Sequence, residues 1–448
     1  MINILFLAFE FPPLNRGGVH RALGFVKWLP KFGINPVVVT LDESSYENVF
    51  DTYSYDESLG AEVRKSASVV SIQSASLKDQ NRAQRFISIY FSLSGNEVRR
   101  WKENYFATLP QIMDKYKPTC ILATLPPFSM IPLASKTASD WRLPLILDFR
   151  DAWSQWRTLP FGTRMHYWAN LKMERKYLEF AEKIIATSEQ TLEDFKKIHS
   201  ELPVSKFHYI PNGYDGNLNK WEPVDPGKKN LLIGYVGSFY YTPEAREQML
   251  KPWWKKRGHR MLQYIPQKQD WLYRSPYFFF RVLRYISEHF SEQSKKVKVV
   301  FVGKKPKWLE EMVREFGLDQ QVELAGMKSH QEALDFQKQC DMLLITSAKR
   351  LGGLDYSIAG KTFEYIQAQK PILAFVPDGA QKAILQKTGM ALICDPDNEK
   401  ESAEKMIDLM DGKIQLMPQK NFIESLSREE LTRKLALIIE DASRKQRP

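Results

Sequence analysis

The stretch 349–365 combines glycines, a lysine and a glutamate in a pattern typical of phosphate binding. Three glycines and a serine predict a loop that leads into a helix beginning near Lys361: Gly352, Gly353, Ser357 and Gly360. Exposed backbone N–H groups at a helix N-terminus, next to a lysine, favour an anion such as a pyrophosphate. Glu364 lies one turn into the helix, where its carboxylate could accept hydrogen bonds from a ribose diol.

An ATP-binding Walker loop is excluded by spacing. Six residues separate Gly353 from Gly360, whereas the Walker pattern requires four between its two glycines. The alternative to a ligand site is that Glu364 is simply an exposed helix residue. The apolar neighbours Phe363, Tyr365 and Ile366 make that alternative less attractive.

Two further motifs follow predicted strands in the N-terminal half. Gly17 and Gly18, in the segment 9–18, can bring backbone N–H groups close to an anion at a helix N-terminus. The segment 148–153 (DFRDAW) has three charged residues where ligands bind in parallel sheets, and Asp151 is its best candidate for a sugar hydroxyl. The alternative for the two glycines is an ordinary tight turn. For the segment 148–153 it is a helix cap in which Arg150 pairs with Asp148 or Asp151.

These residues require elements that place strand ends side by side. Short apolar runs alternate with segments of helical spacing in both halves of the chain, which predicts α/β domains with doubly wound parallel sheets. The runs in the N-terminal half are 2–9, 36–41, 68–72, 119–124, 143–148, 183–187 and 207–210. Those in the C-terminal half are 231–236, 297–302, 321–325, 341–346, 371–376 and 389–394.

The alternation predicts two Rossmann-like domains, 1–215 and 231–448, joined by a linker at 216–230 that is rich in proline and glycine. The second domain is expected to carry an insertion at about 240–273 and to end in a closing helix. Ser329 and Glu332 form a predicted capping box. Two such domains in tandem predict a ligand cleft between them. Neither has G-x-G-x-x-G after its first strand, so a dinucleotide-dependent dehydrogenase is disfavoured.

Composition restricts the class of protein further. The 448 residues include only three cysteines, far apart in sequence, which argues against a disulfide framework and structural zinc. No apolar run approaches about 18 residues, so no transmembrane helix is expected. We therefore expect a cytoplasmic protein. The net charge of +11 is concentrated in residues 251–284, which contain nine Lys and Arg residues and one acidic residue.

The basic window 251–284 also holds nine aromatic residues. No nucleic-acid-binding motif accompanies it, so a nucleic-acid partner is not expected. Tryptophan, tyrosine and lysine together suit an anionic membrane surface, and the alternative is a solvated helical hairpin. The aromatic and basic stretch 86–106 could add a second membrane contact near an acceptor.

The order of these motifs resembles the retaining glycosyltransferase family 4, which has the two-domain B fold, and within it a bacterial subgroup with a Gly-Lys-x-Phe-Glu-Tyr signature. The resemblance covers most of the chain outside about 80–110 and 240–273. It is carried by FPPLNRGG (11–18), IPNGYD (210–215), YVGSF (235–239) and GKTFEYIQAQKPIL (360–373).

The resemblance implies a nucleotide-sugar donor and a role for several residues. Gly17 and Gly18 would face the donor phosphates, and the YVGSF turn with Gly237 and Ser238 would open the nucleotide domain. Arg274 resumes the pattern after the insertion and would bind the diphosphate with Lys361, while Glu364 would hold the ribose. The residues expected near the base follow the strand 321–325: Met327 and Lys328.

One position departs from the family pattern. The family has a second glutamate eight positions before Glu364, and this chain has Tyr356 there. That replacement removes a contact to the donor sugar, for which Asp355 could substitute. Members of the subgroup resemble this chain in that respect.

The resemblance implies retaining transfer without a metal ion or cofactor, in which Asp151, Lys361 and Arg274 are the catalytic candidates. The expected acceptor is a glycan or a lipid-linked molecule of bacterial surface polysaccharide or glycoconjugate assembly, and a lipid-linked one would be reached at the membrane. Two alternatives stay open. One is a nucleotide-sugar epimerase of the same fold, for which His20 is the best-placed histidine, and the other is a non-catalytic partner subunit.

Overall fold

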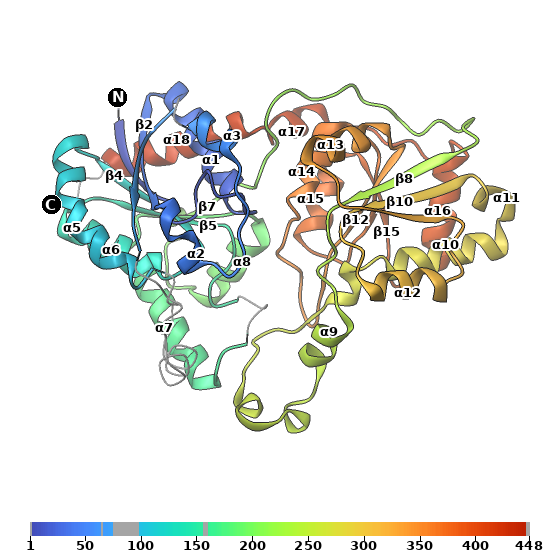
Figure 1. Cartoon of the computed structure of the whole chain (residues 1–448), viewed down its shortest axis with the longest axis horizontal. Helices are drawn as coiled ribbons and strands as arrows, with labels where there is room; N and C mark the ends of the chain where they lie inside the picture. Colours follow the sequence, from blue (N-terminus) through green and yellow to red (C-terminus); the bar gives the residue numbers. More distant parts are fainter. Residues whose placement is uncertain (1, 64–65, 75–97, 156–159, 445–448) are drawn as a thin grey trace. The chain divides into compact units, whose positions relative to one another are not determined.

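The computed structural model describes residues 2–63, 66–74, 98–155 and 160–444. Contacts divide the chain into two compact units (Figure 1). Unit 1 contains Met1–Asp215, Trp253–Pro266 and Ser427–Pro448, and unit 2 contains Gly216–Pro252 and Gln267–Leu426. Each unit is built on one parallel sheet.

Unit 1 has a seven-stranded sheet in the order β3-β2-β1-β4-β5-β6-β7. All its neighbouring strands are parallel. Its strands are β1 (Ile2–Leu7), β2 (Ile34–Leu41), β3 (Ser68–Ile72), β4 (Cys120–Leu125), β5 (Leu145–Phe149), β6 (Lys183–Ala186) and β7 (Phe207–Tyr209). The helices of this unit are α1 (Val19–Trp28), α2 (Tyr46–Val49), α3 (Glu57–Val63), α5 (Trp101–Tyr116), α6 (Met130–Asp140), α7 (Arg164–Phe180), α8 (Glu189–Ile198) and α18 (Arg428–Arg444).

Unit 2 has a six-stranded parallel sheet in the order β11-β10-β8-β12-β14-β15. Its strands are β8 (Leu231–Val236), β10 (Val297–Val302), β11 (Val322–Gly326), β12 (Met342–Thr346), β14 (Ile372–Phe375) and β15 (Ala391–Cys394). Its helices are α9 (Pro243–Leu250), α10 (Tyr277–His289), α11 (Ser291–Ser294), α12 (Lys307–Glu315), α13 (His330–Gln339), α14 (Lys361–Ala368), α15 (Ala380–Thr388), α16 (Glu399–Met410) and α17 (Lys420–Glu424). The two sheets confirm the predicted fold class.

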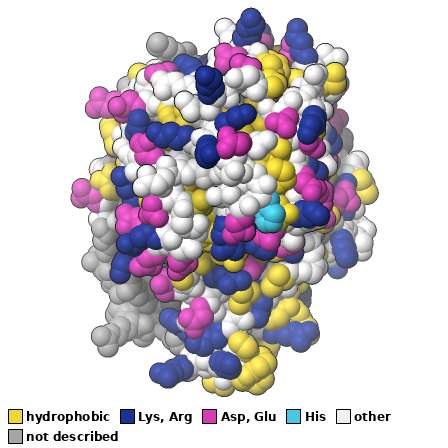
Figure 2. All heavy atoms as spheres, turned by 90° about the vertical axis from the view of Figure 1, so that its right-hand side faces the viewer, with side chains coloured by type: hydrophobic (Ala, Val, Ile, Leu, Met, Phe, Trp, Pro, Cys, Tyr) yellow, Lys and Arg dark blue, Asp and Glu magenta, His cyan; other side chains and the backbone are white. Residues whose placement is uncertain are grey.

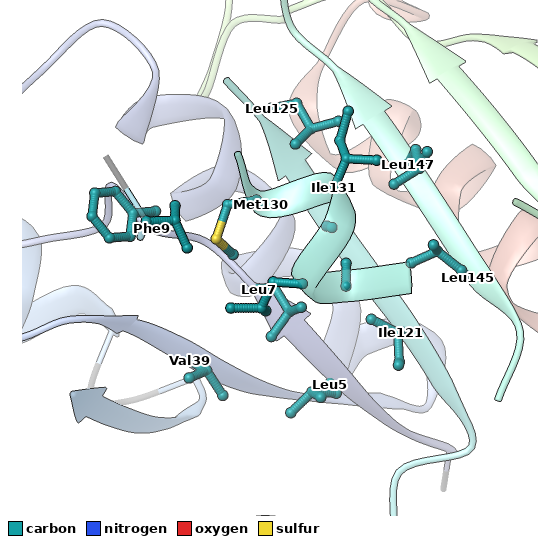
Figure 3. Packing of buried hydrophobic residues seen from close by; sticks show 14 of the residues in the cluster. Leu5, Leu7, Phe9, Val39, Ile121, Leu125, Met130, Ile131, Leu145 and Leu147 are labelled. Carbon is teal, nitrogen blue, oxygen red and sulfur yellow. The ribbon is translucent and has the colours of Figure 1, made fainter. Parts of the chain in front are cut away.

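Both faces of the unit 1 sheet are buried, which explains why its strands are continuous apolar runs. Along β1, Leu5 and Leu7 contribute to one core cluster, whereas Ile4 and Phe6 contribute to the other. Side chains alternate between the faces of a strand, so all four residues from Ile4 to Leu7 are buried. Figure 3 shows the first of these clusters.

The closing helix α18 packs on the second face of the unit 1 sheet. Its buried residues Leu431, Leu435 and Ile439 belong to the same cluster as Ile4 and Phe6 of β1. The sequence predicts this helix as the closing element of the second domain, but its contacts place it in unit 1. Helical spacing reveals an apolar face and does not indicate which sheet that face covers.

The basic window 251–284 does not form one surface. Its second part belongs to α10, where Phe278, Phe279 and Phe280 are buried in the unit 2 core. Its first part is a loop with short 3-10 turns, Trp253–Lys255 and Gly258–Leu262. Of the stretch 86–106, residues 86–97 lie outside the described part, and Trp101 and Tyr105 of α5 are buried.

The predicted capping box at the start of α13 is confirmed. The Glu332 carboxylate accepts a hydrogen bond from the Ser329 backbone N–H, and the Ser329 hydroxyl accepts one from the Glu332 backbone N–H. In the described part of the chain, no helix combines the length and apolar character needed to cross a bilayer.

Candidate active site

Lys361 is the first residue of α14, directly after the N-cap Gly360, whose position has no side-chain cap. Its amine nitrogen lies 3.7 Å from the centre of the Tyr235 ring, on β8. A Cβ atom on Gly237, which has a φ of +114°, would lie 3.0 Å from the same nitrogen. The structure thus brings together two predicted site residues, Lys361 and Gly237, at the carboxyl end of the first strand of unit 2.

The surroundings of Lys361 disfavour its charge. The pKa of the amine is lowered to about 7, chiefly by burial; the charge of Glu364 opposes this shift and that of Arg274 adds to it. A cation–π contact with Tyr235 is weaker compensation than a carboxylate contact would be. The amine is therefore placed where an added anion would stabilise its protonated form.

Arg274 ends a short 3-10 turn, Trp271–Arg274, and lies at the same part of unit 2. Its Nη2 donates to the hydroxyl of Ser357 at 3.4 Å, and its guanidinium carbon lies 5.6 Å from the Tyr240 ring centre. Arg274 is far in sequence from Ser357 and Lys361, and this contact joins the three residues in one region.

Asp355 holds Ser357 in this region by hydrogen bonding. Its buried carboxylate accepts a hydrogen bond from the Ser357 hydroxyl at 2.5 Å and one from the Gln269 amide at 3.3 Å. A series of contacts thus runs from Gln269 through Asp355 and Ser357 to Arg274. The carboxylate already has two protein donors, so a direct contact between Asp355 and the sugar remains a prediction.

The returning end of the insertion anchors this series. β9 (Gln269–Asp270) pairs antiparallel with β13 (Lys349–Arg350), an element that the sequence did not predict. Asp270 also accepts two hydrogen bonds from Arg246, at 2.7 and 2.8 Å. The insertion is therefore fixed to the loop that carries Ser357.

The other residues of the segment 360–365 hold α14 in place. The Tyr365 hydroxyl accepts a hydrogen bond from the Val236 backbone N–H at 3.1 Å, and Phe363 is buried. Thr362 bonds Gln381 on α15 at 3.1 Å. Glu364 is half-buried and accepts from Gln337 at 3.3 Å, so one carboxylate oxygen is fixed by a neighbour on α13.

The other residues of unit 2 that were predicted to bind the sugar donor lie at strand ends. Ser238 follows Gly237 and its carbonyl accepts from the Tyr235 hydroxyl at 3.3 Å. Met327 and Lys328 follow β11, and both are exposed. A Cβ on Gly303 would lie 2.1 Å from the Gly237 carbonyl oxygen, so the turn after β8 requires glycine directly after the neighbouring strand β10.

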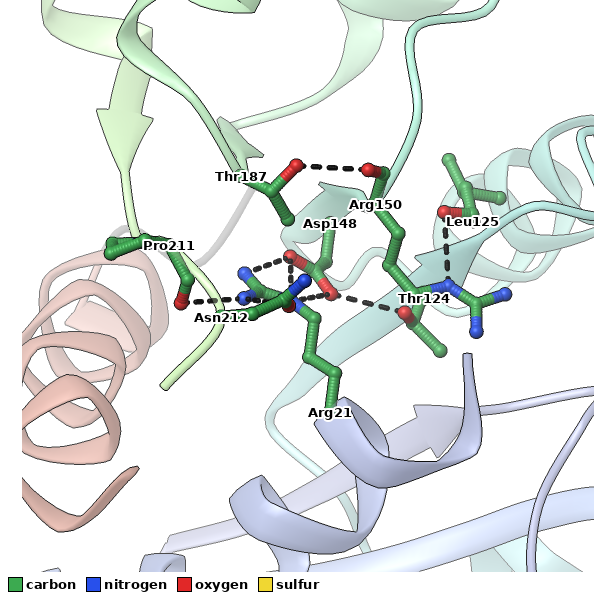
Figure 4. A network of polar contacts seen from close by, with 8 residues as sticks. All are labelled: Arg21, Thr124, Leu125, Asp148, Arg150, Thr187, Pro211 and Asn212. Atoms are coloured by element: carbon green, nitrogen blue, oxygen red, sulfur yellow. Dashed lines mark hydrogen bonds and ion pairs between the residues drawn. The ribbon is translucent and has the colours of Figure 1, made fainter. Parts of the chain in front are cut away.

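In unit 1 the strand ends carry a buried polar centre (Figure 4). Asp148, at the end of β5, is fully buried and accepts hydrogen bonds from Arg21 Nε and Nη2, the shortest at 2.7 Å, and from Thr124 at 3.0 Å. Arg21 also donates to the Pro211 carbonyl at 3.0 Å. The alternative of an ion pair between Arg150 and Asp148 is therefore wrong, because Asp148 pairs with Arg21.

Arg150 extends past Asp148 toward the glycine-rich loop. Its Nε donates to the Leu125 carbonyl at 3.2 Å and its Nη2 to the Pro126 carbonyl. A Cβ on Gly18 would lie only 1.5 Å from Arg150 Nη1, whereas Gly17 has open space around it. Asp151 follows Arg150 and is half-buried.

Several of these partners carry no distinguishing signal in the sequence. Arg21 occupies a helical apolar face and nothing in its spacing marks it as the partner of Asp148. Tyr235 and Gln269 were likewise unremarkable in sequence, since their roles depend on contacts across strands. Among the described residues, no group of three or more His, Cys, Asp or Glu is arranged to hold a metal ion.

Both halves of the chain match models of glycosyltransferase families. Residues 16–217 match the model described as Glycosyltransferase Family 4, and residues 275–412 match the model described as Glycosyl transferases group 1. The insertion at 240–273 lies outside both ranges. A search of curated proteins gave no match.

Solved structures with the same fold cover nearly the whole chain. Sucrose-phosphate synthase from Thermosynechococcus elongatus is 13% identical with a TM-score of 0.63, covering 98% of this chain and 99% of that one. A glycosyltransferase from Rickettsia africae ESF-5 is 14% identical with a TM-score of 0.58, covering 99% of each chain. Anabaena Alr3699/HepE in complex with UDP and glucose is 15% identical with a TM-score of 0.56, covering 98% and 100%. At these identities the likeness shows the fold alone.

Proposed function

We propose that the chain, which has the B fold and matches glycosyltransferase family models in both halves, transfers a sugar from a nucleoside-diphosphate sugar to a glycan or lipid-linked acceptor. In this proposal the sugar is transferred with retention of configuration and without a metal ion or cofactor. The single observation that carries it is the pair of cations, Lys361 and Arg274, at the N-terminus of α14.

The pair suits the departure of a diphosphate. Negative charge develops on the leaving group when the bond to the sugar breaks, and donors already fixed in position stabilise that charge best. Lys361, Arg274 and the first N–H groups of α14 can act on the diphosphate together. In the proposal, Glu364 binds the ribose, and Gly237, Ser238 and the exposed residues Met327 and Lys328 lie along the nucleotide.

Asp151 is the proposed acceptor-side residue. It follows β5 at the edge of the sheet where α/β domains bind ligands, and its neighbours Asp148 and Arg150 are held by other contacts. Asp151→Asn keeps the size of the side chain and removes its charge. We expect this variant to lose transfer to the acceptor while donor binding is unchanged.

Bacterial surface polysaccharide or glycoconjugate assembly is the proposed setting. The family match supports a glycan acceptor, and the complex of Anabaena HepE with UDP and glucose supports a nucleotide-sugar donor for proteins of this fold. The nature of the sugar is left to experiment, because Tyr356 stands where the family has a glutamate.

A panel of UDP-, GDP- and dTDP-sugars tests the activity. We expect release of one nucleoside diphosphate by the wild type, and a loss of roughly tenfold to 150-fold in Lys361→Met and Arg274→Met if each removes a charge-assisted contact of about 1.5–3 kcal/mol in the transition state. Lys420→Met is the matched control, since Lys420 is exposed on α17. An epimerised nucleotide sugar would instead identify an epimerase, and no turnover of any donor would favour a non-catalytic subunit.

A position at the cytoplasmic face of an anionic membrane is part of the same proposal. Trp253, Trp254 and Leu262 in the insertion loop are 60%, 63% and 66% exposed. In the described part of the chain, three exposed cations of this loop take part in no ion pair: Lys255, Arg257 and Arg260. Figure 2 shows apolar and basic side chains together at its lower end, which is where Figure 1 has this loop.

Helix α7 adds to the same surface. Phe161, before α7, and Tyr264, after the loop, exchange two backbone hydrogen bonds of 2.9 Å. The first turns of α7 expose Met165 and Trp168, at 80% and 58%. Exposed apolar side chains flanked by unpaired cations suit an interface with anionic lipid headgroups.

Flotation with vesicles tests this membrane proposal. We expect binding to phosphatidylcholine vesicles that contain phosphatidylglycerol, weaker binding at high salt, and little binding to phosphatidylcholine alone. Replacing Trp253, Trp254 and Leu262 with serine should abolish binding, whereas Met417→Ser, at a 70% exposed position elsewhere, should not. Equal flotation of both variants would contradict the proposal.

A further inference from the structure

The segment that follows β5 is buried although it is a loop. Residues 152–155 belong to no helix or strand, and each is at most 4% exposed. Connecting segments normally run over the surface, because the polar groups of a buried loop must find partners inside the protein. Each polar side chain of this segment therefore needs a partner.

Ser154 has its partners within unit 1. The buried Glu174 carboxylate of α7 accepts a hydrogen bond from the Ser154 backbone N–H at 3.0 Å and one from its hydroxyl at 2.5 Å. His199, directly after α8, makes a third hydrogen bond with that carboxylate at 2.9 Å. The Trp153 ring stacks on Phe128 with ring centres 5.7 Å apart. The loop is therefore fixed in place as far as Ser154.

Gln155 is the exception in this segment. The residue is 4% exposed, and neither its amide nitrogen nor its amide oxygen has a hydrogen-bond partner among the described residues. A primary amide offers two donors and an acceptor, and leaving them unpaired in a buried position reduces stability. The buried Gln381 of unit 2 shows the usual arrangement. Its amide oxygen accepts from the Ala359 backbone N–H at 2.8 Å, and its amide nitrogen donates to Thr362 at 3.0 Å.

A trapped water molecule would be a poor partner for the Gln155 amide. A buried water ordinarily makes about three hydrogen bonds to polar groups around it. The preceding polar side chain, Ser154, already donates to Glu174, and that carboxylate already accepts three hydrogen bonds. The amide therefore suits a ligand group that supplies both a donor and an acceptor of its own.

We propose that the Gln155 amide binds a hydroxyl group of the acceptor sugar and thereby contributes to acceptor specificity. The inference rests on the proposed function for the identity of the ligand. Asp151, the proposed acceptor-side residue, lies four positions earlier in the same loop. A sugar hydroxyl both donates and accepts a hydrogen bond, which matches a neutral amide. A fully ionised phosphate offers acceptors alone and would leave the amide oxygen unpaired.

Thermal unfolding of two leucine variants tests whether the amide is unpaired in the folded protein. Gln155→Leu removes polar atoms that have no partner, so its Tm should equal or exceed that of the wild type. Gln381→Leu is the matched control, since it removes a bonded amide and should lower the Tm by roughly 2–4 °C. An equal loss of Tm in both variants would overturn the inference, because it would show that Gln155 is bonded within the protein.

Transfer to soluble acceptors tests the ligand. The probes are methyl glycosides of glucose, galactose, mannose and N-acetylglucosamine, with the nucleotide sugar that the donor panel selects. We expect Gln155→Leu to lower kcat/KM for the glycoside that the wild type uses by roughly three- to tenfold, the effect of one neutral hydrogen bond, while the KM of the donor is unchanged. Unchanged kcat/KM for that glycoside would overturn the inference.

Monodeoxy forms of the same glycoside identify the hydroxyl. One of them should be used equally well by wild type and Gln155→Leu, because it lacks the group that the amide binds, whereas the others should keep the difference. A variant that lowers kcat/KM equally for every deoxy form would assign Gln155 a structural role and overturn the inference.

Saturation-transfer NMR with the same methyl glycosides requires no turnover, so the two proposals fail separately. Binding of a glycoside by the wild type and its loss in Gln155→Leu would support the site even if no nucleotide sugar were turned over. Equal binding by both proteins, or binding of no glycoside by the wild type, would overturn it.

Discussion

Arg21 of unit 1 and Lys361 of unit 2 are compensated very differently. In unit 1, Arg21 has a carboxylate partner, because Asp148 accepts from two of its nitrogens and from Thr124 as well. In unit 2, the half-buried Lys361 lies over the face of Tyr235 and makes no contact ion pair among the described residues; the charge of Glu364 favours its protonated form and that of Arg274 disfavours it. One arrangement is electrically complete within the protein and the other is not.

This difference separates structural charge from functional charge. A buried ion pair with satisfied hydrogen bonds holds elements together, and removing one partner leaves an uncompensated charge. A buried cation without a carboxylate reduces stability and gains from binding an anion. The comparison leads to opposite expectations for substitutions in the two units.

The largest expected effect is on stability in unit 1. Asp148→Ala leaves Arg21 buried without its partner and should lower the free energy of unfolding by about 3–5 kcal/mol. Urea denaturation of the variant measures this loss. The double variant Arg21→Met/Asp148→Leu should lose less, and an equal or larger loss would mean that the pair is not the cause.

The next effect is on ligand affinity in unit 2. Lys361→Met should weaken donor binding by about 1.5–3 kcal/mol, the range for hydrogen bonds to charged groups, without lowering the free energy of unfolding. Denaturation and titration of the same preparation compare the two quantities. A variant that unfolds more easily and binds the donor normally would assign Lys361 a structural role.

The affinity for the donor should also depend on pH. The pKa of Lys361 is about 7 in the free protein, and a bound diphosphate raises it by favouring the charged form. Affinity should therefore be constant below pH 7 and fall above it by up to tenfold per pH unit, or about 1.4 kcal/mol. The intact nucleotide sugar is the probe, because its diphosphate diester does not titrate in this range.

The matched control for the pH effect is Lys361→Arg. Arginine stays charged at these pH values, so this variant should bind the donor with little dependence on pH between 7 and 9. The same decline in affinity in wild type and variant would show that another group titrates.

A smaller effect is expected from the contacts behind the site. Gln269→Leu removes one hydrogen bond to Asp355 and should raise the KM for the donor by the equivalent of about 0.5–1.5 kcal/mol. Gln331→Leu is the control, since Gln331 makes a comparable bond on the exposed surface of α13. Equal kinetics in the two variants would show that Asp355 does not depend on Gln269.

The parallel sheets were predictable because buried strands in α/β folds are continuous apolar runs. The run 231–236 coincides with β8 and the run 297–302 with β10. The two-residue ribbon of β9 and β13 was not predictable, because two residues show no periodicity. Its pairing depends on the return of the insertion to the loop after β12.

The candidate site was predictable only where it depends on residues close together in the sequence. Lys361 and Gly360 follow from local rules for a helix N-terminus, and Arg274 was found through the resemblance to the family. The ring under Lys361 and the polar series behind Ser357 depend on contacts between residues more than 80 positions apart. Spacing along the chain carries no information about such contacts.

The insertion illustrates the limit of composition. Residues 251–284 appear as one basic and aromatic segment, yet Phe279 and Phe280 are core residues and Trp253 and Trp254 are exposed. Only burial separates aromatic residues that stabilise a domain from those available to a partner. That separation confines the membrane proposal to the loop and the first turns of α7.

Calorimetric titration of the intact nucleotide sugar, in buffers of different ionisation enthalpy, tests the central claim most directly. If Lys361 is the cation that meets the donor diphosphate, wild-type protein takes up close to one proton per donor bound at pH 8, and Lys361→Met takes up none. Donor binding with no proton uptake in the wild type, or with equal uptake in both proteins, would contradict the claim.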